Sequence, residues 1–190
     1  KNPRRLTFDE RDDLPLDCTR DSQAVLFSSD RNGQFDIFKQ ALDQETAEPV
    51  LTGLGNKFGV LSPDGNLIVY VQGDADGKIR IMRRPISGGP PEMVLEGKGL
   101  NGHACSRFPA TRCVLSEESP DRKQRIFTEF DPMKGRGREL IRVTLKQPGV
   151  SHPWELAPDG SHLAFAQNLG GKECRIQILP LSGGETREVV

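Results

Sequence analysis

The sequence predicts an all-β protein made of four similar four-stranded antiparallel sheets. Two observations predict this fold class: short apolar runs alternate with turns rich in Gly, Pro and Asp, and the same series recurs along the chain. The most regular copy covers residues 61–97, where SPDG precedes LIVYV, a second turn precedes KIRIM, and ISGGPP precedes EMVLEG. Alternation with a period of two residues is typical of strands with one buried face, and such short turns favour antiparallel hairpins.

The repeat is marked by a turn aspartate, which is Asp21 in TRDS, Asp64 in SPDG and Asp159 in APDG. Asp21 and Asp64 are about 43 residues apart, and the interval of about 95 residues from Asp64 to Asp159 leaves room for two units. The intervening unit is degenerate, with RCVLSE, SPDRKQ and RIFTEF in place of the second strand, the hairpin turn and the third strand. Four strands in a unit of this length predict the blades of a β-propeller.

Each unit supplies the same four predicted strands. The second strand is nearly all apolar and is expected to lie centrally, buried on both faces, at 24–27, 67–70, 113–115 and 163–165. The third strand alternates, and the short, more polar fourth strand is expected at the outer edge. The predicted blades cover 14–53, 54–97, 98–146 and 147–190, with 1–13 as the outer strand of a preceding or closing blade.

The turns between the predicted strands have a simple chemical explanation. In PDG, proline fixes its own φ, aspartate accepts hydrogen bonds from backbone amides two residues on, and glycine adopts positive φ. We therefore interpret a set of five residues as structural rather than catalytic or metal-binding: Asp21, Asp64, Gly65, Asp159 and Gly160. The run GDADG at 73–77 resembles part of a calcium loop but lacks the later acidic ligands, so a hairpin turn is favoured there.

The four cysteines do not form the dense framework of a small disulfide-rich domain. Cys105 and Cys113 flank a short loop that a hairpin would close, which predicts a disulfide in an oxidising compartment or two free thiols otherwise. Cys18 and Cys174 occur in strand-like runs, so we expect buried thiols at both positions.

Composition excludes several classes of protein. The formal net charge of -1 argues against a nucleic-acid binder and a polybasic membrane module. No apolar stretch approaches the roughly 20 residues that a membrane-crossing helix needs. The chain lacks an initiator Met and a signal peptide, and it starts and stops inside strand patterns, so we expect a piece of a longer protein.

The repeated motif resembles the WD-like repeats of TolB-type β-propellers, in which SPDG-x-x-I-x-Y is followed by a short turn, an alternating strand and a Gly-Gly corner. SPDGNLIVY from Ser62 and APDGSHLAF from Ala157 carry the resemblance best, TRDSQAVLF from Thr19 carries it well, and the third unit departs most. The chain looks most similar to propeller regions attached to bacterial winged-helix regulators or serine/threonine kinases. The resemblance implies a partial propeller, since TolB-type rings usually have about six blades.

Recognised catalytic patterns are absent from the sequence. It has no G-x-S-x-G nucleophile elbow, no G-x-x-x-x-G-K-[ST] phosphate loop, and no Asp box, because glycine comes one place early in SPDG. His103 near Cys105 and Cys113 imitates part of a zinc site but lacks a fourth ligand at suitable spacing. We therefore expect no enzyme activity, no metal and no cofactor in this chain.

Two weaker candidates for recognition remain. His152 and Trp154 in VSHPWEL lie on the strand expected to line the central channel, where they would either contact a ligand at the channel mouth or pack in the core. A locally basic set would form a solvated hairpin or a positive rim for a phosphate or an acidic partner: Arg122, Lys123, Arg125, Lys134, Arg136, Arg138 and Arg142.

The expected function is that of a non-catalytic module for protein interaction or ligand sensing within a larger bacterial signalling protein. The alternatives are the propeller of a prolyl-oligopeptidase-type serine peptidase, whose catalytic domain lies outside this chain, and an envelope protein partnered like TolB. The resemblance implies an extracytoplasmic location, periplasmic or cell-surface, with the cytoplasm as the alternative. Open strand edges at the chain ends would permit a homo-oligomer.

Overall fold

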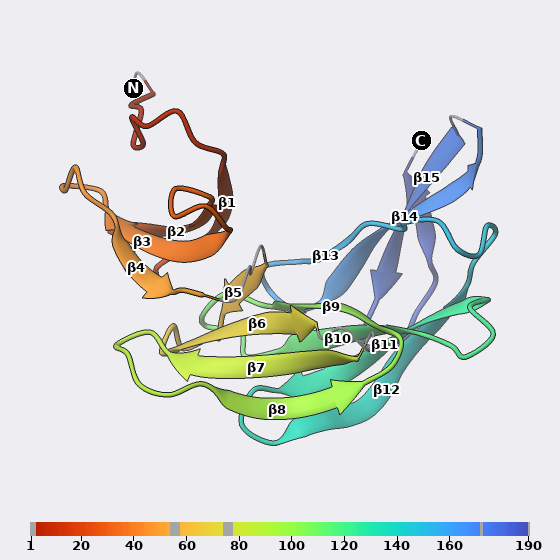
Figure 1. The fold of residues 1–190 in the computed structure, drawn as a ribbon. Helices are drawn as coiled ribbons and strands as arrows, with labels where there is room; N and C mark the ends of the chain where they lie inside the picture. The colour runs from red at the N-terminus through yellow and green to blue at the C-terminus, as the bar shows by residue number, and fades with distance from the viewer. Residues whose placement is uncertain (1–2, 54–57, 74–77, 172, 190) are drawn as a thin grey trace.

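The computed structural model describes residues 3–53, 58–73, 78–171 and 173–189. Within these ranges the chain forms four antiparallel sheets of four strands each, arranged as the blades of a four-blade β-propeller (Figure 1). The predicted fold class is confirmed. No helix in the described ranges has the length and apolar character that crossing a membrane requires.

The strands of each blade pair in chain order, so the first strand is the inner edge and the last is the outer edge. Blade 1 consists of β1 (Asp13–Cys18), β2 (Ala24–Ser29), β3 (Asp36–Ala41) and β4 (Glu48–Leu51). Blade 2 consists of β5 (Gly59–Leu61), β6 (Leu67–Gly73), β7 (Ile79–Pro85) and β8 (Glu92–Gly97). Blade 3 consists of β9 (Leu100–Cys105), β10 (Cys113–Glu118), β11 (Gln124–Asp131) and β12 (Gly135–Thr144). Blade 4 consists of β13 (Trp154–Leu156), β14 (His162–Gly170), β15 (Glu173–Pro180) and β16 (Arg187–Val189).

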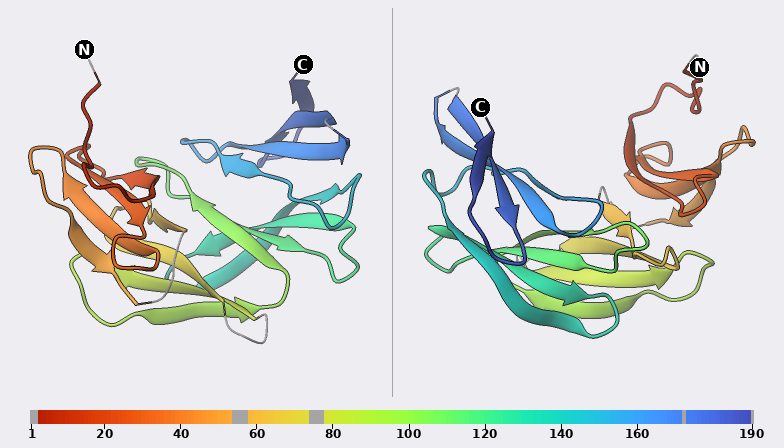
Figure 2. Two further views of the ribbon diagram at one scale, coloured as in Figure 1. Left: turned by 45° about the horizontal axis from the view of Figure 1, so that its top comes forward. Right: turned by 180° about the vertical axis from the view of Figure 1, so that it is seen from behind.

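The four blades follow one another along an arc. The inner strands contact their neighbours in sequence, β1 with β5, β5 with β9, and β9 with β13. Blade 1 and blade 4 lie at the two ends of this arc, with both chain termini on the same side of the molecule (Figures 1 and 2). The inner strands therefore meet near the axis of the arc, and their connecting turns gather at one end of it.

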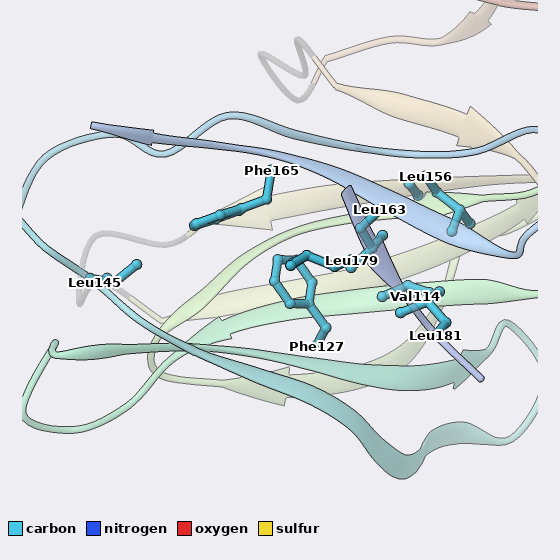
Figure 3. Packing of buried hydrophobic residues seen from close by; sticks show 9 residues of the cluster. Val114, Phe127, Leu145, Leu156, Leu163, Phe165, Leu179 and Leu181 are labelled. Atoms are coloured by element: carbon cyan, nitrogen blue, oxygen red, sulfur yellow. The ribbon is translucent and has the colours of Figure 1, made fainter. Parts of the chain in front are cut away.

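An apolar cluster fills each of the three interfaces between neighbouring blades. Leu26 and Ile37 of blade 1 pack against Ile68 and Tyr70 of blade 2. The interface between blades 3 and 4 is the most aromatic, and Phe127 meets Phe165 edge to face with ring centroids 5.9 Å apart (Figure 3). Burying such side chains is worth roughly 1.5–3 kcal/mol each, so these clusters are the main source of stability.

The free face of blade 1 is covered by the N-terminal segment. Phe27 and Phe38 stack on this face at 5.9 Å between ring centroids, and both are buried. The guanidinium of Arg31 lies over both rings and forms ion pairs with Asp9 and Asp13, each at 3.3 Å. Residues 3–12 form no strand in this structure, so the expected outer strand is not seen here, and its pairing with another blade stays a prediction.

The free face of blade 4 is bare by comparison. Ile176 and Val189 are paired across β15 and β16, and their exposed fractions are 45% and 52%.

The prediction of buried thiols is wrong, because Cys18 and Cys174 are both exposed. The alternating pattern correctly indicated strands, but Cys174 shares the register of the bare blade 4 face and Cys18 ends β1 at the edge of blade 1.

The turn aspartates make the contacts expected of turn-forming residues. Asp64 Oδ1 accepts hydrogen bonds from Ser62 Oγ at 2.5 Å and from the amide of Asn66 at 3.1 Å. These bonds, the one from Ser62 above all, hold the pKa of the Asp64 carboxyl below its usual value. Gly65 has φ +76°, which favours glycine, and Gly160 repeats this conformation at φ +70° beside Asp159. Asp21 likewise accepts from the Thr19 hydroxyl at 2.6 Å.

Blade 3 differs from the others in where this turn lies. Asp121 accepts from the Ser119 hydroxyl at 2.6 Å, but its turn joins β10 to β11 instead of joining the first and second strands. The connection between β9 and β10 is instead the longer loop 106–112. In the other blades the connection at this position is the short aspartate turn. The predicted calcium-like run at 73–77 lies almost wholly outside the described residues.

We predict that Asp64→Ala lowers the free energy of unfolding by about 1 kcal/mol, because the Ser62 hydroxyl and the Asn66 amide each lose an acceptor. Urea denaturation measures this change. Asp43→Ala is the matched control, since Asp43 is an exposed turn residue for which the structure shows no side-chain hydrogen bond. An equal loss in both variants would contradict the structural role of Asp64.

Candidate functional site

A hollow of about 480 Å³ lies near the axis of the arc, at the end where the inner strands finish, which we call the channel mouth. It is lined by the ends of β1, β5, β9 and β13 and by the turns that follow them, so all four blades contribute. The side chains that give it chemical character are Asp17, Arg20, Arg107, Phe108 and Glu155. A concave site with a few polar groups on a rigid frame is the usual form of a ligand site.

The loop 106–112 carries two of these residues and is fixed at both ends. The structure joins Cys105 and Cys113 by a disulfide, and the two residues lie opposite each other in the β9–β10 register. The amide of Arg107 donates to Pro158 O at 2.8 Å, and Arg112 Nη1 donates to Gly160 O at 2.6 Å. The loop is therefore attached both to its own blade and to the PDG turn of blade 4.

Phe108 connects this loop of blade 3 to blade 1, which lies at one end of the arc. The guanidinium of Arg20, on the first turn of blade 1, lies 3.4 Å from the centroid of the Phe108 ring. Phe108 remains 53% exposed, so one part of the ring is open to solvent. Cation–π stacking of this kind is worth about 0.5–2 kcal/mol and restricts the arginine side chain.

The two carboxylates at the hollow, those of Asp17 and Glu155, have different surroundings. Asp17 accepts hydrogen bonds from the amides of Cys18 at 2.8 Å and Leu61 at 3.1 Å, so it joins blade 1 to blade 2. Glu155 is exposed within the hollow, yet the surrounding protein removes part of its hydration and raises the pKa of its carboxyl. The nearby charge of Arg107 opposes this rise, and that of Asp17 adds to it.

Two of the hydroxyl groups at the hollow, those of Thr19 and Ser62, are committed to the turns, whereas the buried Ser106 Oγ has no hydrogen-bond partner in the described part of the protein. Thr19 Oγ1 donates to Asp21 and accepts from the Ala24 amide, while Ser62 Oγ donates to Asp64 and accepts from the Leu67 amide. A serine beside a carboxylate is therefore part of a turn in this position and not an activated nucleophile.

The structure places His152 and Trp154 away from this hollow. His152 is buried and stacks on Phe165, and its ring nitrogens contact Gln147 O and the Asn168 amide. Trp154 packs edge to face on Phe127 with centroids 5.2 Å apart. The geometry thus favours core packing between blades 3 and 4 over ligand recognition at the channel mouth.

The zinc-like cluster has a different arrangement from the one that the spacing suggested. The sulfurs of Cys105 and Cys113 are bonded to each other, and His103 Nε2 contacts Val69 O at 3.0 Å between blades 2 and 3. A carbonyl only accepts, so Nε2 carries the proton, and buried Nδ1 has no hydrogen-bond partner in the described part of the protein. Burial lowers the pKa of His103 to about 4.

Most of the basic residues that would form either a solvated hairpin or a positive rim pair with acidic residues. Arg136 pairs with Glu117 at 2.7 Å, and Arg142 pairs with Glu139 at 2.7 Å. Arg125 does not belong to any rim, because its side chain is only 1% exposed and pairs with Glu118 at 3.0 Å. The sequence did not reveal that Arg125 is buried, because a charged residue in an alternating strand is expected on the solvent-facing side, and in β11 this residue faces the interior.

Arg20, Arg107 and Phe108 of the hollow were not singled out by the sequence analysis. Arg20 follows the first inner strand, and Arg107 and Phe108 follow Cys105 by two and three places. The usable signal is positional: charged or aromatic residues that directly follow the inner strand of each blade are brought together at one end of a propeller.

No known protein-family pattern and no curated protein matches this sequence. Among solved structures, TolB from Acinetobacter baumannii is 18% identical, with a TM-score of 0.64 over 92% of this chain and 42% of that chain. A chain from a structural analysis of two prolyl endopeptidases is 15% identical, with a TM-score of 0.61 over 94% of this chain and 28% of that chain. Oligogalacturonate lyase in complex with manganese is 16% identical, with a TM-score of 0.51 over 91% and 64%.

The chain covers less than two thirds of each of these three proteins. At such low identities, the likeness shows a shared β-propeller fold. The predicted similarity to TolB-type propellers is supported at the level of the fold, with TolB among the structural neighbours.

We predict that two thiols react with a thiol reagent in the native protein, those of the exposed Cys18 and Cys174. The same number should react after denaturation without reductant, because the Cys105–Cys113 bond protects the other pair. Colorimetric thiol counting measures both. Four reactive thiols in the oxidised, denatured chain would contradict the disulfide.

We predict that His103 makes the protein sensitive to mild acid. The pKa of His103 is about 4 in the folded state, below its ordinary value of 6.5, so protonation favours the unfolded chain. Its contribution is complete above pH 6.5 and is lost as the pH falls towards 4, by roughly 3 kcal/mol at most.

Urea denaturation at about pH 7 and about pH 5 measures this dependence. The variant His103→Gln should lose less stability over this interval than the wild type, whereas His162→Gln, at an exposed position, should behave as the wild type. Equal losses in the wild type and the His103 variant would show that other groups cause the acid sensitivity.

Proposed function

We propose that this chain is a non-catalytic β-propeller module that recognises a protein partner or a small ligand through the hollow at its channel mouth. The observation that supports this function is the convergence of all four blades on one concave site, with exposed Arg20, Arg107 and Phe108 at its rim. A rigid scaffold that presents adjustable loop residues is the usual way in which propellers bind.

The chemistry of the site supports binding over catalysis. The hydroxyls of Thr19 and Ser62 are held by turn aspartates, as described above, and the whole sequence lacks a nucleophile elbow. The exposed side chains at the hollow include guanidinium, carboxylate and aromatic groups, which suit the selection of a charged partner.

We further propose that the module belongs to a larger bacterial signalling protein and works outside the cytoplasm. The resemblance of its repeats to the propellers of winged-helix regulators and kinases supports the first part. The Cys105–Cys113 disulfide supports the second, because such bonds persist mainly in oxidising compartments. Self-association through the open strand edges of the blades at the two ends of the arc is a further part of the proposal.

The second candidate is the propeller of a prolyl-oligopeptidase-type peptidase. The structural likeness to prolyl endopeptidases favours it. The polypeptide encoded around this chain distinguishes the two candidates: a kinase or winged-helix domain before it supports the sensor, and a G-x-S-x-G domain after it supports the peptidase.

We predict that a photo-crosslinking amino acid in place of Phe108 captures a partner from an envelope extract of the source cell, in competition with unmodified protein. Phe58 is the matched control, because it is 68% exposed and precedes β5 at the end opposite the hollow. Equal capture at both positions would contradict recognition at the mouth. Turnover of peptide or ester substrates by this chain, abolished by substitution of Arg107, would contradict the non-catalytic function.

A further inference from the structure

We propose that the hollow binds an organic oxyanion, a carboxylate or a phosphate ester, between the guanidinium groups of Arg20 and Arg107. The inference rests on the proposed function and deepens it, because it names the chemical class of ligand for the same site. Both side chains line the hollow, and they come from blades 1 and 3, which are not neighbours along the arc.

These two arginines lack an acidic partner within the described ranges, in contrast to several other arginines of the blades. Arg83 pairs with Glu92 at 2.5 Å, and Arg136 pairs with Glu117 at 2.7 Å. Within the described ranges, no ion pair joins Arg20 or Arg107 to a carboxylate, although both are exposed. Two guanidinium groups that share one concavity without neutralisation provide donors for an anion from solution.

Arg20 is held in a geometry that leaves its donors free. Its guanidinium lies over the Phe108 ring at 3.4 Å, so the contact uses the flat face of the group. The N–H bonds lie in the plane of the guanidinium and form the fork that suits a carboxylate or phosphate. Stacking also removes side-chain freedom before the ligand arrives, which lowers the entropic cost of binding.

The backbone of Arg107 is equally well fixed. Its amide donates to Pro158 O at 2.8 Å, and its carbonyl accepts from Ala110 at 3.0 Å. The preceding residue, Ser106, donates from its amide to Arg112 O at 2.7 Å, inside the loop that the disulfide closes. The position of the second guanidinium therefore depends on a loop that is restrained on both sides.

The two carboxylates at the hollow do not prevent this binding. Asp17 is engaged by two backbone amides. Glu155 lies near Arg107 and attracts its charge, so an ionised Glu155 competes with the oxyanion for that guanidinium. This arrangement makes a specific expectation possible: neutralising Glu155 should strengthen anion binding, whereas neutralising either arginine should weaken it.

The size of the hollow indicates an oxyanion that is part of a larger molecule. A volume of about 480 Å³ is in the range of small-molecule sites and far exceeds what a bare phosphate ion fills. The open part of the Phe108 ring offers an apolar surface for the body of such a ligand.

Isothermal titration of the oxidised protein with glucuronate and with glucose 6-phosphate tests the proposal, with glucose as the uncharged control. We expect at least one of the two anions to bind in a saturable way with Kd below about 1 mM, and glucose not to bind. Arg20→Gln and Arg107→Gln should each weaken binding about tenfold, and Glu155→Gln should strengthen it. Preference for glucuronate or for glucose 6-phosphate identifies the carboxylate or the phosphate as the recognised group.

Arg138→Gln is the matched control, because it removes one positive charge from an exposed arginine that pairs with Glu129 on blade 3. Equal weakening by Arg138→Gln, or no saturable binding of either anion, would overturn the inference. Crosslinking at Phe108 that succeeds while both anions fail would overturn only the ligand class. Anion binding that needs Arg20 and Arg107, without partner capture at Phe108, would support the inference and limit the proposed function to small ligands.

Discussion

The burial of an apolar face between each pair of neighbouring blades is the constraint on which the rest of this structure depends. A single four-stranded sheet has two faces and cannot cover both alone, so the blades stack in sequence. Stacking brings β1, β5, β9 and β13 side by side, because each is the inner edge of its blade. The hollow at the ends of these strands is thus a consequence of packing far from it, including the contact of Phe127 with Phe165.

The candidate site owes part of its chemical character to the irregular blade 3. Blades 1, 2 and 4 close the connection after the inner strand with a short aspartate turn, and the turn of blade 1 carries Arg20. Blade 3 uses the disulfide-closed loop 106–112 instead, and this loop carries Arg107 and Phe108 to the mouth. Regular repeats thereby supply rigidity, and the single departure from the repeat supplies two of the five side chains that give the hollow its chemical character, Arg107 and Phe108.

The outward faces of the two blades at the ends of the arc differ in how well they are covered. On blade 1, the N-terminal segment covers the stacked rings of Phe27 and Phe38, and Arg31 joins that segment to the sheet through Asp9. On blade 4, Ile176 remains exposed in a position whose counterpart in blade 2, Ile81, is fully buried against blade 3. An exposed aliphatic face of this kind favours association with another surface.

Sequence alone determined the strands, their order within each blade and the aspartate turns, because alternation and turn chemistry are local properties that repeat four times. The short spacing of Cys105 and Cys113 allowed either a disulfide or two free thiols, and the structure contains the disulfide. Only the tertiary structure decided which faces find a neighbour, and this is why Cys174 is exposed and His152 is buried. It also decided the meeting of Arg20 with Phe108, since residues 88 positions apart become neighbours only when the blades curve around a common axis.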